Sequence, residues 1–89
     1  NVVTFDSGQD TGSVLTGLTL TGGKNGIYCD NSSSPTVITC FITDNNSVGV
    51  ACVSGSPTIK RCKIGENSGD GINSSSTAPP TIKNSLIYK

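Results

Sequence analysis

The sequence lacks several residue types, and their absence narrows the chemistry open to it. It has no tryptophan, methionine or histidine, and only two tyrosines and two phenylalanines among its 89 residues. Histidine is the commonest general acid–base group and a frequent zinc ligand, so neither kind of histidine site is possible. Alanine occurs only at positions 51 and 78, and no window has sustained 3.6-residue apolar spacing. We therefore expect no helix.

Excess charge and long apolar runs are missing too. Six basic side chains balance six acidic ones, so the chain has no net field to attract nucleic acid or anionic lipid. No apolar run approaches the roughly 20 residues that span a bilayer, and the first residues do not resemble a signal peptide. We expect a single small domain over residues 1–89 that does not insert into membranes. A targeting segment, if there is one, would lie outside this sequence.

The residues that dominate form a repeat. Ser34-Pro35-Thr36-Val37, Ser56-Pro57-Thr58-Ile59 and Pro79-Pro80-Thr81-Ile82 begin 22 and 23 residues apart. Each is followed by a second apolar piece, such as Cys40-Phe41-Ile42 or Cys62-Lys63-Ile64. The first two continue to a third piece that begins with glycine, Gly49-Val50-Ala51-Cys52 or Gly71-Ile72-Asn73-Ser74. Three short strands per repeat, joined by polar turns, are predicted.

Aligning the repeats sorts the apolar residues into columns. Leu15, Val37, Ile59 and Ile82 share one position; Leu20, Ile42, Ile64 and Ile87 share a second; Ile27, Val50 and Ile72 share a third. Stacked parallel strands would turn each column into an apolar ladder. An antiparallel sandwich does not explain why residue identity recurs at the full repeat length. The predicted fold is all-β, a right-handed parallel β-helix of about four coils of about 22 residues.

The sequence also resembles a known family. Pro57-Thr58-Ile59-Lys60-Arg61-Cys62-Lys63-Ile64, Gly26-Ile27-Tyr28-Cys29 and the opening Val2-Val3-Thr4-Phe5-Asp6-Ser7-Gly8 resemble the right-handed parallel β-helix repeat proteins. That superfamily includes the pectate lyases and many secreted or surface bacterial proteins. The resemblance implies an extracellular or cell-surface location and a module or fragment of a longer solenoid. It implies no particular reaction, since the superfamily contains lyases, hydrolases and adhesins.

Four cysteines occupy two columns. Cys40 aligns with Cys62, and Cys29 aligns with Cys52. Leucine, phenylalanine and serine replace them in other coils, which favours buried free thiols that pack as small apolar groups. Disulfides between neighbouring coils remain the alternative, because one-strand spacing lies within the range that a disulfide accepts. Zinc is disfavoured by the absence of histidine and of a Cys-x-x-Cys pair, and no metal or other cofactor is expected.

Acidic and amide side chains also align. Asp44 and Glu66 share the position after the second strand, where they would form either a calcium or acid–base site or two solvated turn residues; the second interpretation is favoured. Asn45 and Asn67 follow directly and predict an asparagine ladder. Asp70 lies in Gly69-Asp70-Gly71, which predicts a turn with positive φ. The three Asn-x-Ser matches, at Asn31, Asn45 and Asn73, mean glycosylation only in a suitable secretory host.

Basic residues gather in the third and fourth repeats. Lys60 and Lys83 align, and Arg61 and Lys63 lie close to Lys60 in the sequence. A polysaccharide lyase needs a basic residue near a sugar carboxylate, but a solvated face that protects the sheet from edge pairing is favoured.

The function that these observations favour is structural. We expect a scaffold repeat module that presents a glycan- or protein-binding face or pairs with itself through open ends. A non-catalytic fragment of a polysaccharide lyase or hydrolase is the alternative. The candidate binding residues are Asp44, Glu66, Asp70, Lys60, Lys63 and Lys83, and no catalytic residue is assigned.

Overall fold

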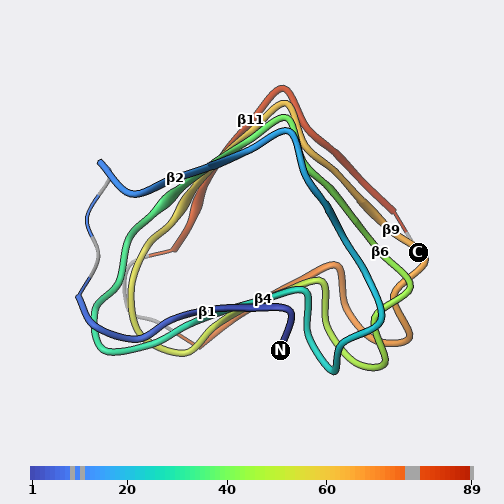
Figure 1. The fold of residues 1–89 in the computed structure, drawn as a ribbon, viewed down its shortest axis with the longest axis horizontal. Helices are drawn as coiled ribbons and strands as arrows, with labels where there is room; N and C mark the ends of the chain where they lie inside the picture. Colours follow the sequence, from blue (N-terminus) through green and yellow to red (C-terminus); the bar gives the residue numbers. More distant parts are fainter. Residues whose placement is uncertain (9, 11, 76–78, 89) are drawn as a thin grey trace.

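The structure, a computed structural model, describes residues 1–8, 10, 12–75 and 79–88. Every regular element in these ranges is a short β-strand, and the chain winds through three strands in each coil. Figure 1 looks down the stack and shows a triangular cross-section, with the N-terminal coil nearest the reader. From there the chain runs clockwise and away from the reader, so the coil is right-handed, as the sequence predicts.

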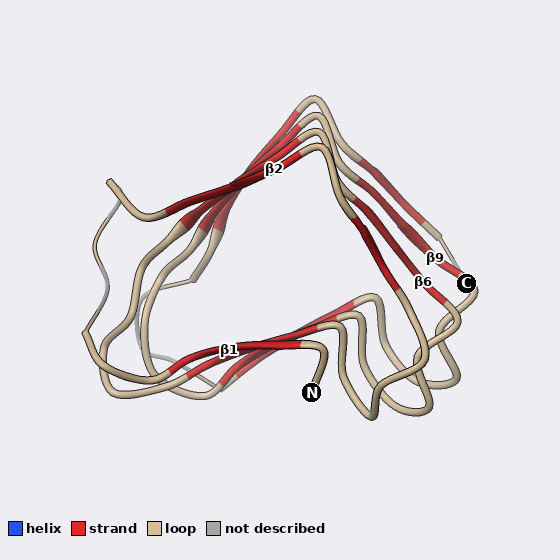
Figure 2. Ribbon diagram, in the orientation of Figure 1, coloured by secondary structure: helices blue, strands red, loops and turns tan. Residues whose placement is uncertain are grey.

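Each side of the triangle is one four-stranded parallel sheet (Figure 2). Sheet A contains β1 (Val3–Phe5), β4 (Ile27–Cys29), β7 (Val50–Cys52) and β10 (Ile72–Ser74). Sheet B contains β2 (Val14–Thr16), β5 (Thr36–Ile38), β8 (Thr58–Lys60) and β11 (Thr81–Lys83). Sheet C contains β3 (Thr19–Leu20), β6 (Phe41–Thr43), β9 (Lys63–Gly65) and β12 (Leu86–Ile87).

The register of the strands confirms the predicted columns. Leu15 pairs with Val37 and Val37 with Ile59, Ile42 pairs with Ile64, and Ile27 pairs with Val50. Partners lie 22 to 24 residues apart, as in Val14 with Thr36 and Val3 with Ile27. β-Branched side chains suit this arrangement because each strand has one face inside and one outside.

The core is the inside of the triangle. Ile27, Val37, Ile42, Val50, Ile59 and Ile64 are fully buried, and the four cysteines and Leu20 complete the cluster. Burying each large aliphatic side chain contributes about 1.5–3 kcal/mol. Pro35 and Pro57 are also fully buried, directly before β5 and β8, where the missing N–H costs no ladder bond.

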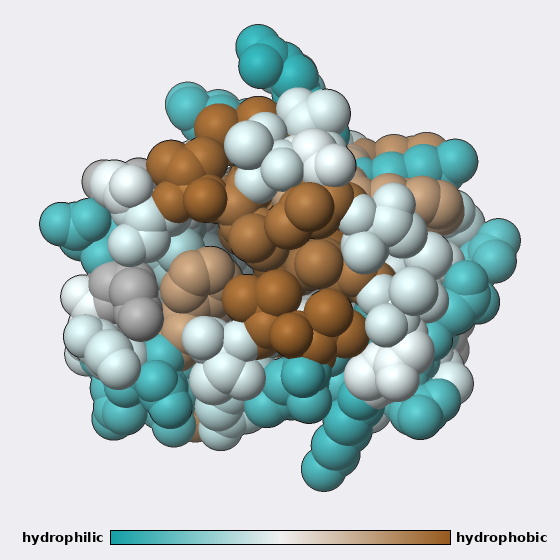
Figure 3. Space-filling view, in the orientation of Figure 1, coloured by the Kyte–Doolittle hydropathy of each residue, from teal (hydrophilic) through white to brown (hydrophobic). Residues whose placement is uncertain are grey.

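Burial fails at the two end coils, although their residues belong to the same columns. Ile82 and Ile87 point inward but are 42% and 40% exposed, because no coil covers them. At the other end, Leu18 is 46% exposed. Figure 3 shows the N-terminal end, where apolar side chains form a patch ringed by polar ones. The stack therefore buries the inward side chains of its two middle coils and leaves apolar side chains exposed at both ends.

Candidate functional site

The asparagine ladder lies inside the stack, at the corner between sheets C and A. Asn45 Nδ2 donates to Asn67 Oδ1 at 3.0 Å and to the carbonyls of Leu20 and Thr43, both at 3.2 Å. Asn45 Oδ1 accepts from the N–H of Gly23 at 3.0 Å. Asn67 Nδ2 likewise donates to the carbonyls of Ile42 and Gly65. Both amides are thus engaged in holding one coil to the next, which confirms the predicted ladder.

The two carboxylates at this corner lie outside it. Asp44 and Glu66 are exposed, and both have left-handed backbone, with φ of 55° and 56°. Gly22 occupies the same position in the first coil, with φ of 81°. Asp44 Oδ2 accepts a hydrogen bond from the Thr43 hydroxyl at 3.1 Å. The backbone at this position is left-handed in all three coils, with glycine, aspartate or glutamate there.

A second left-handed column forms the corner between sheets B and C. Gly17, Thr39, Arg61 and Asn84 have φ between 48° and 70°. The N–H groups of the first three donate to a carbonyl of the next coil, as in Thr39 to Lys60 at 3.0 Å. Arg61 is exposed at this corner, so its guanidinium adds to the basic face that begins at Lys60.

That basic face spans the third and fourth coils. Lys60 and Lys83 are register partners, so their side chains leave neighbouring strands. Lys63 Nζ lies 5.4 Å from the centre of the Phe41 ring and 5.8 Å from that of Tyr88, which are cation–π distances. None of these lysines has an ion pair with a carboxylate among the described residues. Lys60 and Lys83 lie at the end of sheet B and Lys63 at the start of sheet C, so this basic face wraps the corner between two sides of the triangle. Asp44, Glu66 and Asp70 lie between strands of sheets C and A.

The prediction for Gly69-Asp70-Gly71 was wrong. Neither glycine has positive φ, and Gly71 belongs to a column with Gly26 and Gly49. This column needs glycine because of close packing: a Cβ on Gly49 would lie 2.7 Å from Ile64 Cγ2 and 2.5 Å from the Gly71 carbonyl oxygen. Asp70 is exposed and accepts a hydrogen bond from Asn73 Nδ2 at 3.3 Å.

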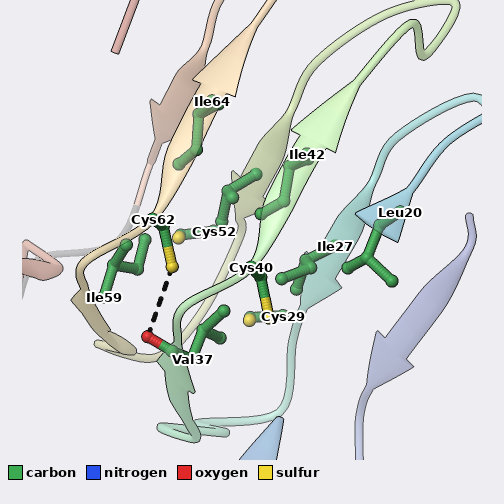
Figure 4. Packing of buried hydrophobic residues seen from close by; sticks show 11 residues of the cluster. Leu20, Ile27, Cys29, Val37, Cys40, Ile42, Cys52, Ile59, Cys62 and Ile64 are labelled. Atoms are coloured by element: carbon green, nitrogen blue, oxygen red, sulfur yellow. Dashed lines mark hydrogen bonds between the residues drawn. The ribbon is translucent and has the colours of Figure 1, made fainter. Parts of the chain in front are cut away.

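The cysteines are buried free thiols in the structure, and their surroundings differ by column (Figure 4). Cys40 Sγ donates to the carbonyls of Ile38 at 3.4 Å and Leu15 at 3.6 Å; Cys62 Sγ donates to those of Lys60 at 3.2 Å and Val37 at 3.5 Å. Ser85, one coil on, makes the matching bond to Lys83 at 2.9 Å. These side chains brace the corner between sheets B and C, and burial raises the pKa of the Cys62 thiol.

The other pair is Cys29 and Cys52, which are register partners in sheet A. Both are almost completely buried, at 0% and 1% exposure. The hydrogen bond between the two thiols, together with burial, raises the pKa of the Cys29 thiol, whereas the same hydrogen bond lowers the pKa of the Cys52 thiol. Thiols enclosed in an apolar ladder act as packing groups, because a nucleophilic cysteine needs access to its substrate.

Metal sites, pockets, membrane-spanning helices and accessible glycosylation sites are the remaining kinds of functional feature. Among the described residues, no three metal-binding side chains gather, and no pocket forms. No helix in the described ranges has the length and composition to cross a membrane. Asn45 is buried with its amide engaged, so that Asn-x-Ser match is closed to modification in the folded chain, whereas Asn31 and Asn73 are exposed.

Sequence reasoning missed both left-handed corners. Their only signal was the first coil, where Gly17 and Gly22 occupy the two positions that later coils give to larger residues. It also missed the hydrogen bonds of Cys40 and Cys62, for which Ser85 in the same column was the available hint.

The fold and its columns define a class. Parallel strands with short turns, stacked in register at one repeat per coil, make a right-handed β-solenoid. The family model described as the right handed beta helix region matches residues 3–89. Because this match covers nearly the whole chain, the protein belongs to that family. No curated protein and no solved structure shows a significant match to the chain.

Proposed function

We propose that the protein is a structural repeat module of an extracellular or cell-surface protein. Its stacked coils form a scaffold that presents the outer sides of the three sheets and extends by end-to-end stacking. The observation that carries this proposal is the unbroken register of all three sheets, from β1 to β10, β2 to β11 and β3 to β12. Several side chains that the sequence singled out serve this register. The Asn45–Asn67 pair and the thiols of Cys40 and Cys62 all bond to backbone of neighbouring coils.

The unpaired strand edges at the two ends of the stack support the proposed end-to-end stacking. Strands β1, β2 and β3 each have one unpaired edge, as do β10, β11 and β12. Unpaired parallel edges beside exposed apolar side chains favour pairing with a further coil of the same register. Such a coil can come from a longer chain, for which residues 1–89 are one module, or from a second copy.

Sedimentation velocity across a concentration series of the chain tests this proposal. We expect the weight-average sedimentation coefficient to rise with concentration while the circular dichroism spectrum stays that of β-structure. A single species of monomer mass at every concentration would contradict end-to-end stacking. Leu18→Ser should weaken the association and Val53→Ser should leave it unchanged, because both residues are exposed but only Leu18 lies in an end coil.

A second candidate function is contact with an acidic polysaccharide, favoured by the cations of the basic face. Lys60 and Lys83 stack at one-strand spacing, and Lys63 is held over two aromatic rings. A non-catalytic part of a polysaccharide lyase or hydrolase would use this face in the same way. Affinity electrophoresis in gels with a carboxylated or a neutral polysaccharide tests it. Retardation in the carboxylated gel should fall for Lys60→Gln with Lys83→Gln and persist for Lys24→Gln.

A further inference from the structure

The two ends of the stack differ in charge and match in register, and together they give association a direction. We infer that copies of this chain stack head to tail, with β1, β2 and β3 of one copy pairing with β10, β11 and β12 of the next. This inference rests on the proposed end-to-end stacking and adds its polarity and its register.

The exposed apolar residues concentrate where this contact would form. Seven large hydrophobic residues of the described chain are exposed, and six of them belong to the two end coils. They are Val2, Val14 and Leu18 in the first coil and Ile82, Leu86 and Ile87 in the last. Val14 and Leu86 face outward, because their strand neighbours Leu15 and Ile87 face inward, so Leu18, Ile82 and Ile87 are the inward residues that the ends leave uncovered. Figure 3 shows a continuous apolar patch over the open core at the N-terminal end. Contiguous apolar patches with a polar rim are typical of protein interaction surfaces.

The columns match across a head-to-tail junction. Moving a second copy four coils along the axis puts its Leu15 on Ile82 and its Leu20 on Ile87, which are the pairings that Val37–Ile59 and Ile42–Ile64 already make inside the stack. The translation also keeps the strands parallel, so the backbone edge of β1 meets that of β10 as β4 meets β7 within the chain. Two like ends would instead pair their edges antiparallel and lose this match.

Charge separates along the axis in a way that opposes contact between like ends. Residues 1–45, which make the first two coils, carry four acidic side chains and one basic, for a net side-chain charge of −3. Residues 46–89 carry two acidic and five basic side chains, for a net charge of +3. Complementary potentials steer encounters and penalise the wrong orientation, within about 8–10 Å at physiological salt. Head-to-tail contact brings opposite charges together, and either like-end contact brings equal charges together.

The chain termini are compatible with the same junction. Strand β1 opens sheet A and strand β12 closes sheet C, on either side of the corner between those sheets (Figure 1). A head-to-tail junction would therefore continue the path of the coil and omit only this corner. Because the contact is between different surfaces and leaves a free end on each copy, it builds an open filament rather than a closed dimer.

Variants with one added, exposed cysteine test the polarity at two register positions. Thr4 and Asn73 face outward in one column of sheet A, Thr4 on β1 and Asn73 on β10. In the inferred junction, residue 4 of one copy lies one strand spacing, about 4.8 Å, from residue 73 of the next. Thr4→Cys and Asn73→Cys proteins are mixed and treated with a short bismaleimide, and the linked peptides are mapped by mass spectrometry.

We expect peptides that contain position 4 to be linked to peptides that contain position 73 in the mixture, and little product from either protein alone. Predominant linkage of two Thr4→Cys chains, or of two Asn73→Cys chains, would overturn the inference. So would a mixture that associates in sedimentation without the mixed product; in that case stacking survives and the register fails. Sedimentation as a monomer at every concentration would contradict both the end-to-end stacking and its head-to-tail register.

Charge variants provide an independent readout. Lys83→Glu reduces the positive charge of the C-terminal half, and Lys24→Glu increases the negative charge of the other half. At 50 mM salt we expect the first to weaken association several-fold and the second to leave it unchanged or strengthen it, with both effects fading at about 500 mM. Equal weakening by both variants would contradict the charge argument.

Discussion

The asparagine ladder allows a quantitative test of how the coils are held together. Changing Asn45 to alanine removes the acceptor of the Gly23 N–H and the donor to Leu20 O, Thr43 O and Asn67 Oδ1. No buried side-chain N or O atom in the described chain lacks a partner, so the native ladder has no spare donor or acceptor to compensate. Four lost hydrogen bonds at about 0.5–1.5 kcal/mol each give an expected cost of about 2–6 kcal/mol.

The assay is urea unfolding at 25 °C, followed by circular dichroism. For a mid-range cost of about 4 kcal/mol and a slope of about 2 kcal/mol per molar urea, the midpoint should fall by about 2 M. Asn46→Ala is the matched control, because Asn46 is the next residue, is exposed, and donates a backbone hydrogen bond to the Gly23 carbonyl that alanine keeps. Its free energy of unfolding should change by less than about 0.5 kcal/mol. Equal midpoints for the two variants would refute the assignment of the ladder as a major source of stability.

Asn45→Asp extends the test to pH. The new carboxylate would still accept from Gly23 N–H but would face three oxygen acceptors, which favours its protonated form and raises its pKa above the ordinary value of about 3.9. A raised pKa in the folded state means that stability is retained below that ordinary value and lost as pH rises through the raised one. We therefore expect Asn45→Asp to be closer to wild type at pH 3 than at pH 7, relative to Asn46→Asp. The reverse order would contradict the hydrogen-bond pattern.

The remaining predictions concern burial, backbone conformation and the thiols. Ile64→Asp, at a fully buried position, should prevent folding as judged by circular dichroism, while Tyr28→Asp on the outer face should fold; equal effects would mean that the register is wrong. Thr39→Asn should raise the free energy of unfolding by about 0.5–1 kcal/mol, because asparagine tolerates the left-handed backbone that a β-branched residue resists, and a loss of stability in urea unfolding would argue against that strain. Cys62→Ser should cost less than about 1 kcal/mol in the same assay, since a hydroxyl can keep the bond to the corner carbonyl, and Cys29→Ser about 1–3 kcal/mol; the opposite order would count against the corner hydrogen bond. Alkylation with mass spectrometry should find four free thiols after denaturation and few before it, and finding none after denaturation would mean disulfides between coils.

The sequence was sufficient to predict the fold because one constraint repeats. Each Pro-Thr-Ile or Cys-x-Ile piece is ambiguous by itself, but its return after a fixed interval aligns the inward residues of every coil. That alignment predicted the three columns, the pairing of Cys29 with Cys52 and the Asn45–Asn67 ladder. Repetition also explains why the sequence indicated few functional residues. A residue type that recurs in a column because of packing looks the same as one that recurs because of chemistry.

The parts that could not be predicted depend on backbone conformation and on contacts across coils. Glycine at position 49 is compatible with either positive φ or close packing, and only the position of Ile64 decides between them. Asp44 and Arg61 hold left-handed conformations without any local sequence signal. The placement of Lys63 over Phe41 and Tyr88 joins neighbouring coils, so it follows from the stacking and not from neighbours in the chain.

The constant spacing of register partners has a consequence for how the chain folds. Among the described residues no strand pairs within its own coil, and each strand partner lies about one coil away, at 22 to 24 residues, as in Thr19 with Phe41 or Val3 with Ile27. Strand partners are therefore separated by about a quarter of the chain length, and domains dominated by such non-local pairing fold slowly. The slow event is closing the first loop of about 22 residues between two middle coils, at an entropy cost that grows only logarithmically with loop length. Each later coil then meets a template already formed, so we expect the folding rate to be set by that first pairing and to change little when coils are added.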